Sequence, residues 1–316
     1  MDRVFASEAK GCGFESRQAH LNNMKIIPLA FDSLGTRSMC TYVETHDVKI
    51  LIDPAVALAP NRSSRPPHPI EVDLMMKEWK KIKSYAHKAD VLIVTHYHYD
   101  HHNPEEPEIY KGKIVYLKHP LQKINKSQTK RANYFLKKLV NFPKQIEYSD
   151  GREFKFGKTT ITFSPAVPHG WDEKLGCVTE VLIDDGKTKF IHTSDVEGAT
   201  VKSQQAFIFR NDPDICLIDG PMTYIFGMHT KTLKHLIEGT KRMKTLIVDH
   251  HYLRDLKWKE KMADVYKAAE KRKVKLVCAA EFLGEKMDQL EPIRKKLYED
   301  HPAKMGEPKY VPWLVK

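Results

Sequence analysis

Residues 91–102 constrain this chain more than any other stretch. An apolar run, Val-Leu-Ile-Val-Thr, leads directly into five potential metal ligands, which are His96, His98, Asp100, His101 and His102. The run predicts a buried strand of a sheet that is covered on both faces. The polar cluster then falls in the loop at the carboxyl end of that strand, where open α/β sheets bind their ligands. Imidazole nitrogens and carboxylate oxygens are donors that zinc accepts in proteins.

Spacing within the loop indicates two neighbouring sites. His96 and His98 are two residues apart and can face the same way, so both can hold one ion, and Asp100 and His101 lie just beyond and can hold a second. The competing interpretation is a chance polar loop, which a chain of this length would contain in about one case in several hundred. The buried strand in front of the loop favours the metal site.

The same pattern recurs along the chain. Other apolar runs that predict strands also end in a polar group, namely Asp53, His169, Asp195, Asp219 and His250. Scattered surface residues would not each follow a strand in this way. Together with His96 this makes six strands, and we expect the polar groups at their ends to lie at one edge of the fold. A carboxylate just past a strand, such as Asp195, can bridge two metals, which lie roughly 3.5–4 Å apart in two-metal sites.

The His-x-His-x-Asp-His loop after an apolar strand resembles the metallo-β-lactamase superfamily. Within it, five further stretches resemble an uncharacterised archaeal branch of metal-dependent hydrolases: 33–38 with 41–45, Leu-Ile-Asp-Pro at 51–54, Asp-Gly-Pro at 219–221, and Asp-His-His-Tyr-Leu-Arg-Asp at 249–255. The resemblance covers Met24 to about His301. It implies an α/β fold, the metallo-β-lactamase-like αββα sandwich in a single domain, and it is specific for fold and metal site but weak for substrate.

The resemblance also implies roles for individual residues. His96, His98 and His169 would bind one zinc ion, while Asp100, His101 and His250 would bind a second, with Asp195 between the two. Asp53 would brace the histidine loop, although a turn-forming Asp-Pro is the alternative. We favour His250 over His251 as the ligand, because it is the first histidine after its strand, and we assign His102 and His251 to supporting positions.

The function expected from this site is a hydrolase with two Zn²⁺ ions per chain, Mn or Fe being possible, in which a hydroxide held between the ions attacks the substrate. Asp100 and Asp195 are the acids expected to serve catalysis. A phosphodiester, in a small molecule or in nucleic acid, is the preferred substrate; a thioester or lactone is the alternative. Weaker candidates for substrate contact are Asp219, Tyr224, His119, Lys130, Arg131 and Arg254.

Two other classes of protein remain possible. One is an iron-dependent oxidoreductase; the flavodiiron relatives carry a glutamate at the position of His98, which argues against them, whereas a single-iron site that oxidises sulfur is harder to exclude. The other is a non-catalytic nucleic-acid-binding protein with a structural metal, against which the full ligand set argues.

The amino-acid composition limits the kinds of partner that we expect for this chain. The formal net charge is +11, with 52 Lys and Arg against 41 Asp and Glu, which favours anionic partners. The basic stretch from Lys123 to Lys144 is either a solvated helix face or a contact surface for an anion or nucleic acid. Five irregularly spaced cysteines fit a reduced, cytoplasmic setting. No apolar run reaches the roughly 20 residues that span a bilayer, so we expect no membrane partner. The sequence leaves the oligomeric state open.

Residues 1–23 have neither helical nor strand periodicity. The codons for Gly-Phe-Glu-Ser-Arg at 13–17 can begin GGG-TTC-GAA-TCC-CG, which contains GGTTCGAATCC, a string that resembles the T-arm of a tRNA gene. We therefore expect translation to start at Met24, with 1–23 a non-native or disordered extension, 24–301 the domain and 302–316 a tail.

Periodicity also places the regular elements. Strands are expected at 25–30, 41–45, 48–52, 113–117, 145–149, 153–156, 159–165, 178–184, 189–193, 215–218, 245–248 and 274–279. Helices are expected at 70–89, 133–140, 229–243, 260–271 and 285–299, with Leu136, Leu139 and Val140 turned inward on the second of them.

Overall fold

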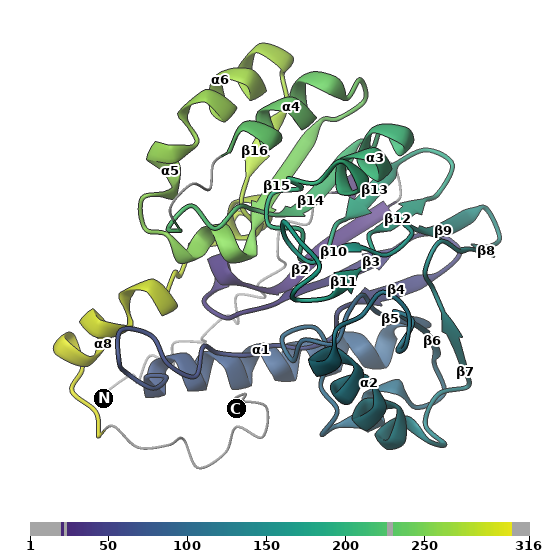
Figure 1. The fold of residues 1–316 in the computed structure, drawn as a ribbon, viewed down its shortest axis with the longest axis horizontal. Helices are drawn as coiled ribbons and strands as arrows, with labels where there is room; N and C mark the ends of the chain where they lie inside the picture. Colours follow the sequence, from purple (N-terminus) through teal and green to yellow (C-terminus); the bar gives the residue numbers. More distant parts are fainter. Residues whose placement is uncertain (1–19, 22–23, 226–229, 305–316) are drawn as a thin grey trace, which may run out of the picture.

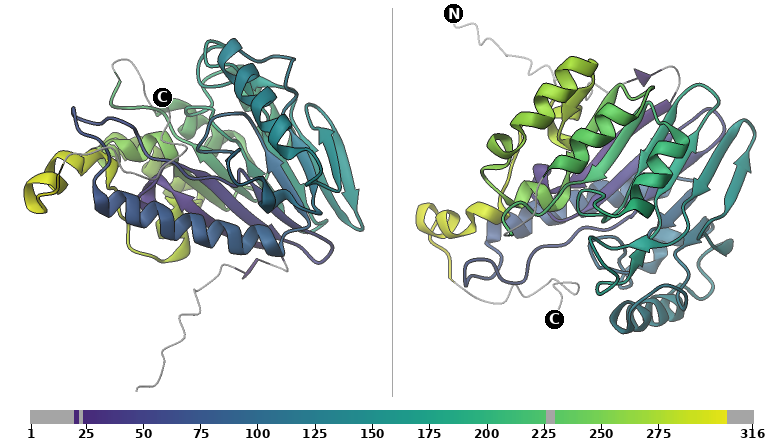
Figure 2. Two further views of the ribbon diagram at one scale, coloured as in Figure 1. Left: turned by 90° about the horizontal axis from the view of Figure 1, so that it is seen from below. Right: turned by 45° about the horizontal axis from the view of Figure 1, so that its top comes forward.

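A computed structural model describes residues 20–21, 24–225 and 230–304. Two seven-stranded sheets lie between helices, with α1 along one side and α3, α4 and α6 along the other (Figure 1). Figure 2 shows the same order of layers from two further directions. The sheets contact each other directly: His192 Nε2 of the second lies 2.9 Å from the carbonyl oxygen of Met39 in the first. The predicted αββα sandwich is confirmed.

The first sheet has the strand order β1-β2-β3-β4-β5-β6-β7. Neighbours are antiparallel from β1 to β4 and parallel from β4 to β7. The strands are β1 (His20–Leu21), β2 (Met24–Phe31), β3 (Met39–Glu44), β4 (Lys49–Ile52), β5 (Val91–Val94), β6 (Ile114–Leu117) and β7 (Gln145–Tyr148). The four residues of β5 are completely buried, as their apolar run predicts.

The second sheet has the order β16-β15-β14-β13-β12-β9-β8, with β13 to β16 parallel and the rest antiparallel. Its strands are β8 (Glu153–Phe156), β9 (Thr159–Phe163), β12 (Val181–Asp184), β13 (Lys189–His192), β14 (Ile215–Asp219), β15 (Thr245–Asp249) and β16 (Lys275–Val277). A separate two-stranded ribbon joins β10 (Val167–Pro168) to β11 (Cys177–Val178).

The α-helices are α1 (Pro69–Lys88), α2 (Lys126–Leu139), α3 (Lys202–Asn211), α4 (Lys231–Gly239), α5 (Trp258–Lys261), α6 (Ala263–Arg272), α7 (Ala279–Leu283) and α8 (Arg294–Asp300). Short 3-10 helices are η1 (Asp32–Leu34), η2 (Pro107–Tyr110), η3 (His250–Arg254) and η4 (Glu291–Ile293). In α1 a capping box forms, since His68 Nδ1 accepts from Ile70 N and Glu71 accepts from His68 N.

Several expected boundaries are wrong. The helix expected at 133–140 begins at Lys126, because Asn125 caps it by accepting from Gln128 N at 2.8 Å, and Val140 beyond its end is 61% exposed. The helix expected at 260–271 breaks at Met262, and the one expected at 285–299 is confined to 291–300. The strand expected at 178–184 is interrupted because β11 pairs with β10 and not with the sheet. The expected start of α4 at His229 and most of 1–23 lie outside the described residues.

Parallel pairing explains why polar groups converge. Adjacent parallel strands end at the same edge of their sheet, so Asp53 and His96 emerge together after β4 and β5. In the second sheet Asp195, Asp219 and His250 emerge together at the ends of β13, β14 and β15. The face-to-face packing of the sheets then brings both sets of strand ends to one site.

Glu180, between β11 and β12, is fully buried, and neither of its carboxylate oxygens has a hydrogen-bond partner among the described residues. Burial raises its pKa well above the ordinary value of 4.5. The folded state therefore holds a proton that the unfolded chain releases, and the free energy of unfolding falls as the pH rises above 4.5. We expect Glu180→Gln to remove this slope, which is at most about 1.4 kcal/mol per pH unit, and to raise stability at pH 8. Denaturant unfolding from pH 4 to pH 9 measures it; an unchanged slope would contradict the assignment.

Candidate metal centre

The histidine loop turns back on itself directly after β5. Thr95 begins the turn by donating its backbone N–H to Asp53 Oδ1 at 2.8 Å and its hydroxyl to Asp53 Oδ2 at 2.7 Å. The carbonyl of His98 then accepts from the backbone N–H groups of His101 and His102, at 3.0 and 3.2 Å. The loop is closed by its own backbone, so its imidazoles are held in place before any ligand arrives.

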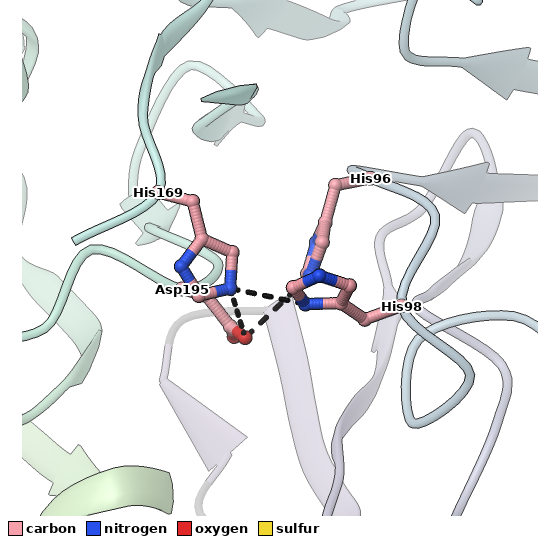
Figure 3. A group of neighbouring side chains, drawn as sticks. All are labelled: His96, His98, His169 and Asp195. Atoms are coloured by element: carbon pink, nitrogen blue, oxygen red, sulfur yellow. Dashed lines mark hydrogen bonds and ion pairs between the residues drawn. The ribbon is translucent and has the colours of Figure 1, made fainter. Parts of the chain in front are cut away.

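Four donors gather on one side of the site, and Figure 3 shows them pointing toward one another. They are His96, His98, His169 and Asp195, each with one ligand atom within 4.8 Å of the others. His169 Nε2 lies 3.1 Å from His98 Nδ1 and 3.1 Å from Asp195 Oδ2, while His96 Nε2 lies 3.5 Å from the same oxygen.

A second group lies on the other side of Asp195. It consists of Asp100, His101 and His250. The second oxygen of the shared acid, Asp195 Oδ1, lies 3.0 Å from His101 Nε2 and 3.5 Å from His250 Nε2. His250 Nε2 is also 3.7 Å from Asp100 Oδ2. The two oxygens of Asp195 therefore face different groups, which is the placement expected of a carboxylate between two ions.

His251 joins a third grouping with Asp195 and His250. Both histidines of this pair therefore lie at the site, but their surroundings differ. His250 is fully buried and lies against Asp100, whereas His251 lines the open hollow above the site.

Buried carboxylates hold the far nitrogens of these imidazoles. Asp53 Oδ2 accepts from His101 Nδ1 at 2.8 Å, and Asp32 Oδ2 accepts from His250 Nδ1 at 2.8 Å. Asp219 makes the corresponding contact to His251 Nδ1 at 3.0 Å. A proton fixed on Nδ1 leaves Nε2 as the free donor, so these acids set the tautomer that metal ligation needs.

Unsatisfied buried atoms test whether metal ions fit this donor set. His96 Nε2, His101 Nε2 and Asp195 Oδ1 are buried and make no hydrogen bond among the described residues, although they approach as ion pairs within the cluster, such as His101 Nε2 at 3.0 Å from Asp195 Oδ1. Buried polar atoms without partners are rare and costly in folded proteins. These orphaned atoms belong to both groups and face the space between them, so the residues present fit metal ions.

The histidines of the site differ in the direction in which their pKa values are shifted. Burial, together with the neighbouring His101, lowers the pKa of His96 well below its ordinary value, and burial with His169 does the same for His98. Burial also lowers the pKa of His250, but Asp195 and Asp32 outweigh it and raise the pKa to about 10. Without metal, protons on such imidazoles balance the acids, so ions that bind there must displace protons.

Backbone strain concentrates at the same strand ends. Asp53, Ser194, Glu197 and His250 have φ angles of 49°, 58°, 46° and 63°. Non-glycine residues seldom adopt this left-handed region, and each such residue costs of order 1–3 kcal/mol. Strain of this kind clusters at functional sites, and here it turns the chain so that the side chains of Asp195 and His250 enter the cluster.

A hollow of about 290 Å³ opens above the donors. Its walls carry His98, Asp100, His169, Asp195 and His251 from the cluster together with Arg37, Tyr99, Arg131 and Arg254. Two expected substrate contacts, Arg131 and Arg254, therefore face the site. Arg254 also donates to Asp32 at 2.7 Å, which connects it to His250.

The other expected substrate contacts do not line this hollow. Asp219 is fully buried and contacts His251. Tyr224 lies beneath the guanidinium of Arg62, 5.5 Å from its ring centroid. His119 packs against Tyr148 and accepts from Leu121 N. Lys130 is exposed on the far side of α2.

The supporting position expected for His102 agrees with its contacts. Its Nδ1 lies 2.9 Å from the carbonyl of His98, and its ring stacks on Tyr99 and meets Phe135 of α2. His102 is completely buried and points away from the donors. It therefore supports the loop from behind.

Sequence reasoning missed Asp32, Glu197 and Arg37. Asp32 follows β2 directly, so the strand-end rule could have found it. Glu197 lies 3.8 Å from His169 Nδ1, and burial raises its pKa to about 7. A Cβ on Gly170 would lie 2.5 Å from the Glu197 carboxyl, so this close approach requires glycine. No local pattern marks Arg37.

Two sheets packed between helices, with a cluster of His and Asp donors at the strand ends, form the metallo-β-lactamase-like fold that the histidine loop predicts. None of the protein-family models compared matches the chain. The chain belongs to the UPF0282 family: it is 45% identical over 291 residues to the UPF0282 protein of Korarchaeum cryptofilum, covering 90% of this chain and 97% of that protein. It is 47% identical over 295 residues to the UPF0282 protein of Metallosphaera sedula, covering 89% and 96%.

Solved structures align more distantly. An isothiocyanate hydrolase from Delia radicum gut bacteria has a TM-score of 0.47 and 16% identity, covering 77% of this chain and 94% of that chain. Tm1679, a metal-dependent hydrolase of the β-lactamase superfamily, has a TM-score of 0.44 and 12% identity, covering 81% and 95%. A diphosphatase from the PhnP family has a TM-score of 0.44 and 12% identity, covering 72% and 87%. Among the described helices of the present protein, none combines the length and apolarity needed to cross a bilayer.

Proposed function

We propose that the protein is a hydrolase that uses two zinc ions and acts on a phosphodiester or another small anionic substrate. One observation carries the proposal: the two donor groups meet at Asp195, and the buried atoms His96 Nε2, His101 Nε2 and Asp195 Oδ1, which make no hydrogen bond among the described residues, lie around it. Buried polar atoms without a hydrogen bond are rare in folded proteins, and bound metal ions would satisfy all three.

In this proposal His96, His98 and His169 hold one ion, Asp100, His101 and His250 hold the other, and Asp195 contributes one oxygen to each. Ions bound there would lower the pKa of water toward about 7 and polarise an oxygen of the scissile bond. Other residues of the chain orient the metal ligands. Asp53 and Asp32 keep the imidazoles in the ligating tautomer, and the closed histidine loop removes the need for reorganisation on binding.

The anionic substrate is supported by the wall of the hollow. Arg37 and Arg254 are already paired with Glu291 and Asp32. Arg131 lies over the ring of Tyr99, 4.8 Å from its centroid, and has no carboxylate partner among the described residues. A guanidinium beside the donors, free of a carboxylate, suits a phosphoryl or carboxylate oxygen. This favours a phosphodiester over a neutral thioester or lactone.

The remaining basic residues between Lys123 and Lys144 give less support to a nucleic-acid surface. Lys123 pairs with Glu173 at 3.3 Å and Lys138 with Glu105 at 3.5 Å, and neither lines the hollow. The hollow is small, and a small molecule fits it better than a polymer.

The direct test joins metal analysis to turnover. We expect two zinc ions per chain by elemental analysis, and turnover of bis-p-nitrophenyl phosphate that a chelator abolishes and added zinc restores. We expect His98→Ala to lower this turnover by about 10³-fold, since one ion loses a ligand. Lys138→Ala, on the outer part of α2, serves as the control. One iron per chain, or turnover unaffected by chelation, would overturn the proposal.

A further inference from the structure

A second hollow of about 210 Å³ adjoins the metal centre. His169 and Leu175 line both hollows, so the two adjoin at these residues. The second hollow is lined by the apolar side chains Trp171, Leu175, Met222 and Ile225, by the buried Glu197, and by Asp172 and Lys174, which pair with each other at 3.2 Å. A ligand bound at the donors therefore has an apolar surface next to it.

The apolar residues of this hollow are unusually exposed. Trp171 is 60% exposed, Leu175 45% and Ile225 41%, whereas the other two tryptophans that the structure describes, Trp79 and Trp258, are buried. Exposed apolar side chains gathered in a concave patch mark binding sites more often than scattered ones do. An exposed indole beside a polar metal centre offers a flat face for stacking.

The loop that carries Trp171 and Leu175 is held in place. Asn125 donates to the carbonyl of Lys174 at 2.8 Å, and Gln128 donates to that of Leu175 at 2.5 Å. Gln128 also accepts from the backbone N–H of Tyr97 in the histidine loop. Helix α2 thus ties the apolar hollow to the metal loop, and Arg131 lies on the same helix. Hydrogen bonds from the start of α2 to Lys174 and Leu175 therefore link the loop of Trp171 to the helix that carries Arg131.

We infer that the substrate carries a planar aromatic ring that stacks on Trp171 in this second hollow, while its anionic group lies between the donors and Arg131. The inference rests on the proposed function and narrows it to a ring-bearing phosphate ester. The ring can be an aryl group or a nucleobase, because both present the same flat apolar face. Both hollows together have the size of a small-molecule pocket.

Binding without turnover tests the ring site. Isothermal titration of the zinc-loaded protein with phenyl phosphate and with methyl phosphate compares a ring and a methyl group on the same anion. We expect phenyl phosphate to bind about tenfold more tightly, Trp171→Ala to abolish this preference, and Arg131→Gln to weaken both ligands alike. Leu121→Ala, which removes an exposed apolar side chain outside the hollow, is the matched control. Because Trp171 is mostly exposed, its truncation leaves the core intact.

A paired turnover measurement separates this inference from the proposed function. Bis-p-nitrophenyl phosphate carries aromatic rings, so Trp171→Ala should raise its KM about tenfold. The inhibition constant of phenyl phosphate against this turnover should rise equally, and that of methyl phosphate, which has no ring, should stay within twofold. Turnover with equal KM values in wild type and variant, or equal binding of both phosphates, would overturn the ring site and leave the hydrolase standing. A Trp171-dependent preference in binding without turnover of any phosphodiester would support the ring site and refute the hydrolase. Tighter binding of adenosine monophosphate than of phenyl phosphate would identify the ring as a nucleobase.

Discussion

Asp195→Ala is expected to reduce turnover by about 10³-fold or more and to reduce the bound metal to one ion per chain or fewer. Both donor groups depend on this acid, since Oδ2 faces His96 and His169 while Oδ1 faces His101 and His250. In the proposed two-metal site its removal would take a ligand from each ion and leave two positive charges close together without the carboxylate that offsets them. Elemental analysis and steady-state kinetics on the same preparation measure both effects.

Two further variants make this result interpretable. Asp195→Asn keeps the shape of the side chain and removes its charge, so equal losses in both variants would assign the effect to the carboxylate. Asp185→Ala removes an acid from the turn at the opposite end of the β12–β13 hairpin and should leave turnover within twofold. Two bound ions with turnover within tenfold of wild type in Asp195→Ala would refute the bridging role.

The largest expected loss of stability comes from Arg294→Ala. The guanidinium of Arg294 is completely buried and makes two hydrogen bonds to the equally buried Glu71, at 2.8 and 2.9 Å. It also donates to the carbonyl of Ala59 at 2.8 Å, so it joins α8, α1 and the loop between β4 and α1. Removing it leaves Glu71 charged and buried without its partner, which costs about 3–5 kcal/mol. Denaturant unfolding measures the change.

The double variant Glu71→Gln with Arg294→Met should lose less than Arg294→Ala alone. It removes both charges while the amide oxygen of Gln at position 71 can still accept from His68 N, so no unpaired charge remains buried. Lys295→Ala, at the next and exposed position of α8, should change stability by about 0.5 kcal/mol or less. A loss in the double variant as large as that in Arg294→Ala would show that packing, and not the ion pair, stabilises this junction.

The residues of the candidate site that follow the ends of strands could be predicted from the sequence. His96, Asp195 and His250 each follow an apolar run, and parallel strands end at one edge, so their convergence follows from local patterns. The same rule predicts that Asp53, which follows β4, lies next to the histidine loop. It would also have found Asp32, which directly follows β2.

The rule fails where the direction of a side chain matters. His119 follows β6, yet its ring turns outward to Tyr148. Asp219 ends β14, but its carboxylate contacts the imidazole of His251 and does not line the hollow. Arg131 and Lys130 are adjacent on α2, and only Arg131 lines the hollow. The position of a residue in a strand or helix determines the edge or face on which it lies. The direction of its side chain depends on the neighbouring side chains from other elements.

The amino-acid sequence by itself determined the donor types, their phase at the strand ends and hence the kind of fold and site. Those properties depend on alternation and spacing over a few residues. Only the tertiary structure decided which donors share a side of Asp195, that Asp32 holds His250 across 218 positions of the chain, and that an apolar hollow around Trp171 opens beside the donor cluster. Such contacts exist only once two sheets distant in sequence pack together, and no local pattern records that packing.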